Sequence, residues 1–307
     1  MVLVAELVLP YFPPHLGTMR RIVYHPPGSG NYALTPGTSI AFSGMFERIS
    51  PNVTWQVNGE GMRAGGLTPP LSDRYRIATY GDSETFGWSV DLEDTYQHRM
   101  EAIDPRVEVL NFGIPGYNAE QIAGRIEDTV PAYRPDLVLY LVNNNDVDAA
   151  IDVSDPIAAS ELLLRLRFLH QVVFTKPWRQ QKRSSTERYR FLATELDRIA
   201  EYTAARNVPL FLAFMRARTM DGAGRFSTTA ISPAGSHRDE RSAVHLIVVE
   251  ETLERFPPSD HHLPRDAYAA LAESLCMEIA AGASGRCVPP AWEPNVARMH
   301  HVLNVGG

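Results

Sequence analysis

The stretch from Tyr75 to Gly87 reads Tyr-Arg-Ile-Ala-Thr-Tyr-Gly-Asp-Ser-Glu-Thr-Phe-Gly. Its first six residues, 75–80, are β-prone and mostly apolar, and the run ends abruptly at Gly81-Asp82-Ser83. This pattern predicts a strand that leads into a sharp turn. In open α/β sheets the ligand crevice lies at the carboxyl ends of the strands, so a serine placed there faces substrate rather than core. Ser83 is therefore the candidate nucleophile.

More apolar runs follow at regular intervals, with helix-like segments between them. The predicted strands after the first are 107–111, 137–142 and 208–215, and the predicted helices are 95–103, 119–133, 186–206 and 265–281. Residues 137–142 are so continuously apolar that both faces of that strand must be covered, as in a parallel sheet. The pattern leaves residues 244–249 open between a fifth strand and a helix. The alternation predicts an α/β fold in three α/β/α layers, with a parallel sheet of about five strands.

The turn at Gly81-Asp82-Ser83-x-Thr85-x-Gly87 resembles the first sequence block of the SGNH (GDSL-type) serine hydrolases. Three later stretches match that family in its order: 107–118 with its glycine-rich turn, 135–146 ending in Asn-Asp, and 259–264 with Asp and His. The resemblance covers the chain from about residue 75 to 281. It implies a flavodoxin-like sheet and a serine esterase or acyltransferase.

The resemblance also implies a role for each site residue. A serine hydroxyl needs a base within hydrogen-bond reach, and the base needs a partner that fixes its tautomer. Ser83 would be the nucleophile, His262 the base and Asp260 the partner of His262. The oxyanion hole would use the backbone N–H groups of Ser83 and Gly116 and the side-chain amide of Asn145. Taken alone, Gly116 also fits a type II turn, and Asn145 also fits a simple chain turn.

Departures from the family pattern leave alternatives open. The third block usually has Gly ahead of Asn-Asp, whereas this chain has asparagines at 143–144, so the asparagine that faces the hole is not fixed. Position 263 is Leu, so only the shorter Asp-x-His spacing fits, and His261 competes with His262 for the role of base. Glu84 is polar where family members are often apolar, and we expect it to tune the pocket.

The favoured function is hydrolysis of a carboxylic ester with a small or medium acyl group. An acyltransferase that uses an alcohol or sugar acceptor fits the same residues. A metal-dependent phosphoesterase is a third possibility because residues 260–262 spell Asp-His-His, but the Asp-rich stretches that would hold its metals are missing. A non-catalytic binding module is a fourth, and the intact Ser, His and Asp argue against it. The serine mechanism requires no metal or organic cofactor.

Charge and composition limit the partners. The formal net charge of −7 and the pI of about 5.8 argue against binding to nucleic acid or to an anionic membrane. We expect a small-molecule ester as the partner; the sequence does not predict the oligomeric state.

Location is predicted from the amino terminus and the cysteines. The apolar start, residues 1–10, contains Glu6, ends at Pro10 and is too short to span a bilayer. It has neither a basic start nor a small-residue cleavage site. The two cysteines, Cys276 and Cys287, form either one pair or two free thiols, and a reducing compartment is the simpler interpretation. The sequence therefore predicts a cytoplasmic protein, and a secreted mature form whose signal peptide has been removed is the alternative.

The domain organisation follows from changes in composition. Residues 1–70 are predicted to be a loop-rich β appendage, with a Pro- and Gly-rich segment at 11–37 and two strands at 39–43 and 52–58. This appendage covers a sheet edge, shapes the substrate pocket, or grips a polar ligand through Trp55. Residues 71–285 would be the hydrolase domain, with a helical insertion at about 148–185, and 286–307 an irregular tail.

Overall fold

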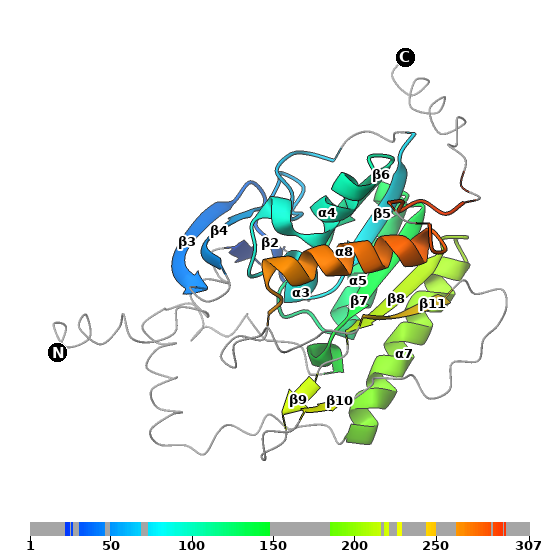
Figure 1. Ribbon diagram of the computed structural model, residues 1–307. Coiled ribbons are helices and arrows are strands. Elements are labelled where there is room, and N and C mark those ends of the chain that lie inside the picture. Colours follow the sequence, from blue (N-terminus) through cyan, green and yellow to red (C-terminus); the bar gives the residue numbers. More distant parts are fainter. Residues whose placement is uncertain are drawn as a thin grey trace, which may run out of the picture.

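The fold is built on one five-stranded sheet. The computed structural model describes residues 22–24, 26, 31–46, 50–68, 73–147, 185–215, 218–220, 226–228, 244–249, 262–283, 285–290 and 292 (Figure 1). The strands are β5 (Tyr75–Tyr80), β6 (Val107–Asn111), β7 (Leu137–Val142), β8 (Leu210–Met215) and β11 (Val244–Val249). All neighbouring pairs are parallel, and the spatial order is β11-β8-β7-β5-β6. Counted along the chain this is the flavodoxin-like order 2-1-3-4-5. The predicted α/β fold is confirmed.

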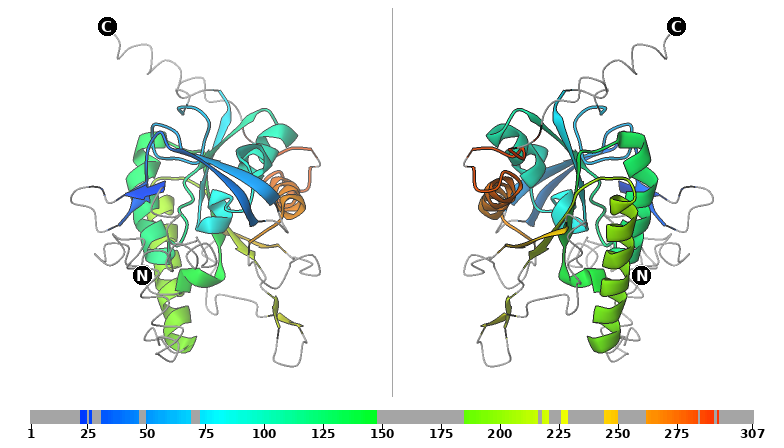
Figure 2. Two further views of the ribbon diagram at one scale, coloured as in Figure 1. Left: turned by 90° about the vertical axis from the view of Figure 1, so that its left-hand side faces the viewer. Right: turned by 90° about the vertical axis from the view of Figure 1, so that its right-hand side faces the viewer.

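In the part of the chain that the structure describes, two pairs of helices cover the sheet, one pair on each face (Figure 2). Helices α4 (Tyr96–Ile103) and α8 (Arg265–Ile279) lie on one face, and α5 (Ala119–Tyr133) and α7 (Ser185–Ala204) on the other. Side chains alternate along each strand. The core under α4 and α8 contains Ile77, Leu139, Leu141, Met100, Leu271 and Leu275. The core under α5 and α7 contains Ala78, Tyr80, Tyr140, Ile122, Ile126 and Leu196.

Helix α5 shows how local sequence and packing act together. Asn118 caps it through a capping box with Gln121. Pro131, inside the helix, has no N–H to donate to the carbonyl of Glu127. The hydroxyl of Tyr202 on α7 donates to that carbonyl instead, at 2.8 Å. The Glu127 carbonyl, which the proline leaves without its helical partner, therefore becomes a point of contact between α5 and α7.

The described part of the amino-terminal section contains two antiparallel hairpins. Strand β1 (Val23–Tyr24) pairs with β2 (Ala33–Leu34), and β3 (Ser39–Phe46) pairs with β4 (Ser50–Gln56). Two strands were expected at 39–43 and 52–58, where β3 and β4 lie, whereas β1 and β2 fall in the segment predicted as loop. Strands of two residues carry no periodic signal.

Trp55 on β4 is fully buried, with its ring centroid 4.1 Å from that of Trp88. Its indole N–H donates to the Trp88 carbonyl at 2.9 Å. The hypothesis that Trp55 grips a ligand is therefore wrong, because Trp55 holds the loop that follows Ser83.

The structure also tests the predictions for the later segments of the chain. Residues 244–249 form a strand, which settles that alternative, and a hairpin of β9 (Arg218–Met220) and β10 (Phe226–Thr228) lies where loop was predicted. The proposed helical insertion falls almost entirely outside the described residues, and so does most of the tail. The division into 1–70, 71–285 and 286–307 stays a prediction.

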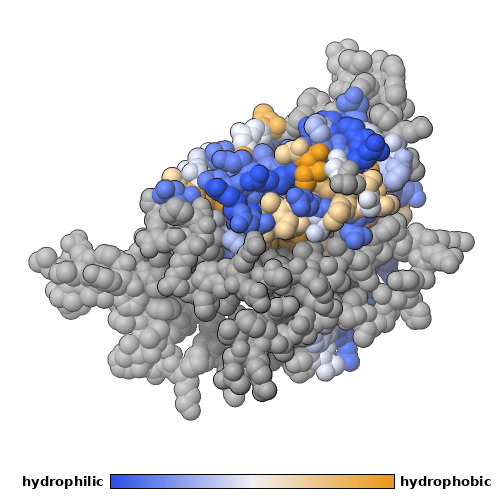
Figure 3. All heavy atoms as spheres, in the orientation of Figure 1, coloured by the Kyte–Doolittle hydropathy of each residue, from blue (hydrophilic) through white to orange (hydrophobic). Residues whose placement is uncertain are grey.

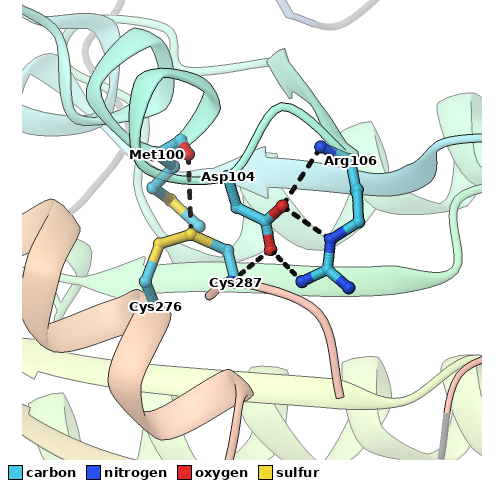
Figure 4. The surroundings of a disulfide bond; sticks show 5 residues. All are labelled: Met100, Asp104, Arg106, Cys276 and Cys287. Carbon is cyan, nitrogen blue, oxygen red and sulfur yellow. Dashed lines mark hydrogen bonds and ion pairs between the residues drawn. A yellow bond between two sulfur atoms is a disulfide. The ribbon is translucent and has the colours of Figure 1, made fainter. Parts of the chain in front are cut away.

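A disulfide joins Cys276 on α8 to Cys287 (Figure 4). Asp104 accepts the Cys287 N–H at 2.9 Å and binds Arg106 through both carboxylate oxygens. The Arg106 guanidinium lowers the pKa of Asp104 to about 2. Val288 is buried next to the bridge. The first residues of the predicted tail therefore pack against α8 and the end of α4.

The outer face over α4 and α8 is mainly hydrophilic, with hydrophobic groups only in small separate clusters among the described residues (Figure 3). On α8 the exposed large hydrophobic side chain is Met277. Within the described residues, no helix is long and apolar enough to cross a membrane.

Candidate active site

Ser83 is the first residue of the short helix α3 (Ser83–Phe86), three residues after β5. Asp82 is the N-cap of this helix, and its carboxylate accepts the Glu84 N–H at 3.0 Å. Asp82 therefore braces the turn. Because β5 lies between β6 and β7, where the strand order reverses, Ser83 is at the point where this fold opens its ligand crevice.

His262 faces Ser83 across 179 residues of sequence. Its Nε2 lies 2.9 Å from the Ser83 Oγ, within hydrogen-bond distance. The ring of Trp88 stacks on the imidazole with 5.8 Å between centroids. The next residue, Leu263, is held on both sides of its backbone, since Ser89 Oγ donates to its carbonyl and its N–H donates to Glu84. The imidazole is therefore supported by contacts from the Ser83 loop itself.

Glu84 is a second carboxyl group in the site, and it is 1% exposed. Its Oε2 accepts the Leu263 N–H at 3.3 Å and the Tyr268 hydroxyl at 3.0 Å. Burial raises the pKa of Glu84 to about 7, against the opposing charge of His262. Sequence reasoning expected Glu84 to tune the pocket and missed its contact with the loop of the base. The sequence indicates only that a carboxyl group in an apolar setting needs a partner, and it does not identify that partner.

Gly116 occupies a tight turn beside the Ser83 loop. The Ile114 N–H donates to the Gly81 carbonyl at 3.1 Å, which joins the two loops. The Tyr117 N–H donates to the Ile114 carbonyl at 3.1 Å, and Gly116 has φ of +79°. With Pro115 before it, this is a type II turn. Within the described residues, no hydrogen bond is made by the N–H of Gly116 or of Ser83.

The 3₁₀ turn η3 (Asn144–Val147) follows β7, and Asn145 lies in it. Asp146 is fully buried and accepts the Asn143 N–H at 2.7 Å and the Tyr140 hydroxyl at 2.8 Å. Burial raises the pKa of Asp146 well above its usual range. The Asn143 side-chain amide donates to Asp82 at 3.1 Å, so it links this turn to the Ser83 loop. The Asn145 side chain lies outside what the structure describes.

Asp260 and His261 also lie outside the described residues. The described part of the chain brings together Ser83 and His262 and places the Gly116 turn against the Ser83 loop. In that same part, no cluster of three or more His, Cys, Asp or Glu side chains is suited to hold a metal.

Comparison with known proteins identifies the family. The model of the GDSL-like lipase/acylhydrolase family matches residues 79–246, which is more than half of the chain. The chain belongs to this family. It is accordingly an enzyme of the esterase and lipase type. No curated protein matches the chain.

Solved structures of esterases are similar to the chain at low identity. The esterase EstA from Pseudoalteromonas sp. is 14% identical with a TM-score of 0.42, over 67% of this chain and 97% of that one. A lipolytic protein of the G-D-S-L family from Veillonella parvula is 15% identical with a TM-score of 0.43, over 67% and 98%. AlinE4, an SGNH-hydrolase family esterase, is 16% identical with a TM-score of 0.39, over 69% and 97%.

Proposed function

We propose that the protein is a serine esterase that hydrolyses a carboxylic ester with a small or medium acyl group. The observation that carries this proposal is the 2.9 Å contact between Ser83 Oγ and His262 Nε2 at the switch point of the sheet. A hydroxyl paired with an imidazole is the arrangement that nucleophilic acyl transfer needs. The family assignment supports the same class of reaction.

The reaction has two halves. Ser83 Oγ attacks the ester carbonyl carbon, and its proton passes to His262 Nε2. The C–O bond to the alcohol then breaks, and the alcohol leaves with the proton from His262. Water, deprotonated by His262, attacks the acyl-enzyme, and the acid leaves as Ser83 regains its proton. Asp260 is proposed to orient the imidazole.

The negative charge on the carbonyl oxygen needs hydrogen-bond donors. The backbone N–H groups of Ser83 and Gly116 are proposed for this role, since neither is used within the described residues. The side-chain amide of Asn145 is proposed as the third donor. Losing one such donor typically raises the barrier by about 2.7–4 kcal/mol. None of these steps uses a metal or an organic cofactor.

Acyl transfer to an alcohol or sugar uses the same acyl-enzyme, and the acceptor that reaches it decides the product.

The sequence predicts a cytoplasmic location, and the disulfide between Cys276 and Cys287 is the observation against it, since disulfides are rare in the cytosol. Alkylation of free thiols in whole cells, before lysis, tests the location independently of the activity.

Single substitutions test the proposed roles. Using p-nitrophenyl esters of increasing chain length, we expect Ser83→Ala and His262→Ala each to lower kcat by about 10⁴–10⁶-fold. His261→Ala is the matched control, and it should retain most of the activity. Loss of activity in His261→Ala with retention in His262→Ala would reassign the base. Activity abolished by a chelator would contradict the serine mechanism.

A further inference from the structure

The amino-terminal section reaches the proposed oxyanion hole through one side chain. The hydroxyl of Tyr32 donates to the carbonyl of Pro115 at 2.7 Å, across 83 residues of sequence. Tyr32 is 1% exposed, directly before β2. Burial raises the pKa of the Tyr32 hydroxyl above its ordinary value, so the group remains a hydrogen-bond donor at neutral pH.

The Pro115 carbonyl belongs to the same peptide unit as the Gly116 N–H. A peptide unit is planar, and in the trans form its C=O and N–H point in opposite directions. The described residues contain no cis peptide bond. A bond that fixes the direction of the Pro115 carbonyl therefore also fixes the direction of the Gly116 N–H.

This peptide unit has a second orientation open to it. In the observed type II turn Gly116 has φ of +79°, whereas rotation of the unit gives a type I turn with φ near −90°. Glycine accepts both conformations, and proline at the preceding position suits both turns. Local sequence alone does not fix the direction of this N–H. The contact from Tyr32 supplies what the turn lacks.

The segment that carries Tyr32 is itself held by two contacts, one to its backbone and one to a side chain. The hydroxyl of Tyr117 donates to the Tyr32 carbonyl, and the two rings meet edge to face with 5.0 Å between centroids. The side chain of Asn31 accepts a hydrogen bond from Gln121 on α5 at 3.2 Å. Tyr32 therefore reaches the turn from a fixed support.

We propose that Tyr32 is a positioning residue of the oxyanion hole, holding the Pro115–Gly116 peptide so that the Gly116 N–H points at the substrate carbonyl. This inference rests on the proposed esterase function. It gives the amino-terminal section a part in the reaction: Tyr32 does not touch the substrate and acts only through the turn.

Tyr32→Phe tests this role, because it removes one hydroxyl and keeps the ring. We expect kcat on a p-nitrophenyl ester to fall about tenfold while KM changes less than twofold. The inhibition constant of an alkyl boronic acid, which forms a tetrahedral adduct with an active serine, should rise by a similar factor. A merely structural role would leave the affinity for this adduct unchanged.

Tyr202→Phe is the matched control, since it also removes a tyrosine bond to a backbone carbonyl, at 2.8 Å and between α5 and α7. It should keep the wild-type kcat and boronic acid affinity. Wild-type kcat in Tyr32→Phe, or an unchanged boronic acid affinity, would overturn the inference. If Tyr32→Phe does not fold, Tyr117→Phe removes the hydrogen bond that holds the Tyr32 carbonyl and should lower kcat with little change in KM; wild-type kcat there would equally overturn it.

The proposed function fails by a different result. If the wild-type enzyme does not cleave the ester, or if Ser83→Ala cleaves it as well as the wild type, the esterase itself is refuted, and the inference falls with it. If the wild type is active and Ser83→Ala is not, the kinetics of Tyr32→Phe test Tyr32 alone.

Discussion

Glu84 directly follows the proposed nucleophile, and its charge depends on pH in the working range. In the folded protein its pKa is about 7, against about 4.5 as the ordinary value. Between these pH values the folded state keeps a proton that the unfolded state releases. The stability of the fold therefore falls as pH rises from about 4.5 to 7 and stays lower above 7, by about 3 kcal/mol in total.

Glu84→Gln removes this titration while keeping the size of the side chain. We expect the free energy of unfolding of the variant, relative to wild type, to be about 2–3 kcal/mol higher at pH 8 than at pH 5. Urea denaturation at the two pH values measures it. Glu120→Gln, at an exposed position of α5, is the control. Its free energy of unfolding relative to wild type should be the same at pH 5 and at pH 8. Equal shifts for Glu84→Gln at both pH values would refute the raised pKa.

Single residues differ in how far the sequence reveals them. Ser83 and His262 could be predicted because each lies in a short stretch of sequence that resembles a block of the SGNH hydrolase family. Tyr32 and Glu84 could not be assigned their contacts, because the partners of each lie 83 and 179 residues away along the chain. The family resemblance assigned the base to His262 with His261 as its competitor, and the contact of His262 with Ser83 supports that assignment.

Among helices and strands, the clearest predictions were those with a long or complete signal. Strands β6 and β7 and helix α5 begin and end where the sequence predicts, since each combines apolar periodicity with a defined stop or cap. Strand β11 stayed ambiguous because a short apolar run fits a strand or a helix until a neighbour pairs with it. Its parallel pairing with β8 decides the matter.

The disulfide fixes the carboxyl end of α8, whereas His262 lies just before the amino end of that helix. It closes a loop of 11 residues' separation, for which chain entropy predicts a stabilisation of about 3 kcal/mol. The double variant Cys276→Ala, Cys287→Ala should lose about this much free energy of unfolding, as should the wild type under a thiol reductant. Because Cys276 lies about 16 Å along the helix from Arg265, kcat should stay near the wild-type value. An unchanged free energy of unfolding in the double variant would contradict the stabilising role. A lowered kcat in fully folded variant protein would contradict the independence of catalysis from the disulfide.

Taken as a whole, the molecule joins two sections that differ in composition. The amino-terminal hairpins pack through Trp55 on the loop after Ser83 and through Tyr32 on the turn at Gly116. The sequence indicated an appendage with two strands, but it gave no sign of these contacts, since they depend on burial across the two sections.

The negative net charge of −7 suits a neutral or small ester better than a polyanion.

The proposed mechanism requires Ser83 to act as a nucleophile with His262 as its base, two residues that only the complete fold brings together. Labelling the full chain with a fluorophosphonate probe and mapping the adduct by mass spectrometry tests this pair. We expect one adduct per chain, located on Ser83, absent from Ser83→Ala and formed far more slowly in His262→Ala. An adduct that survives Ser83→Ala, or one that forms at the wild-type rate in His262→Ala, would contradict this mechanism.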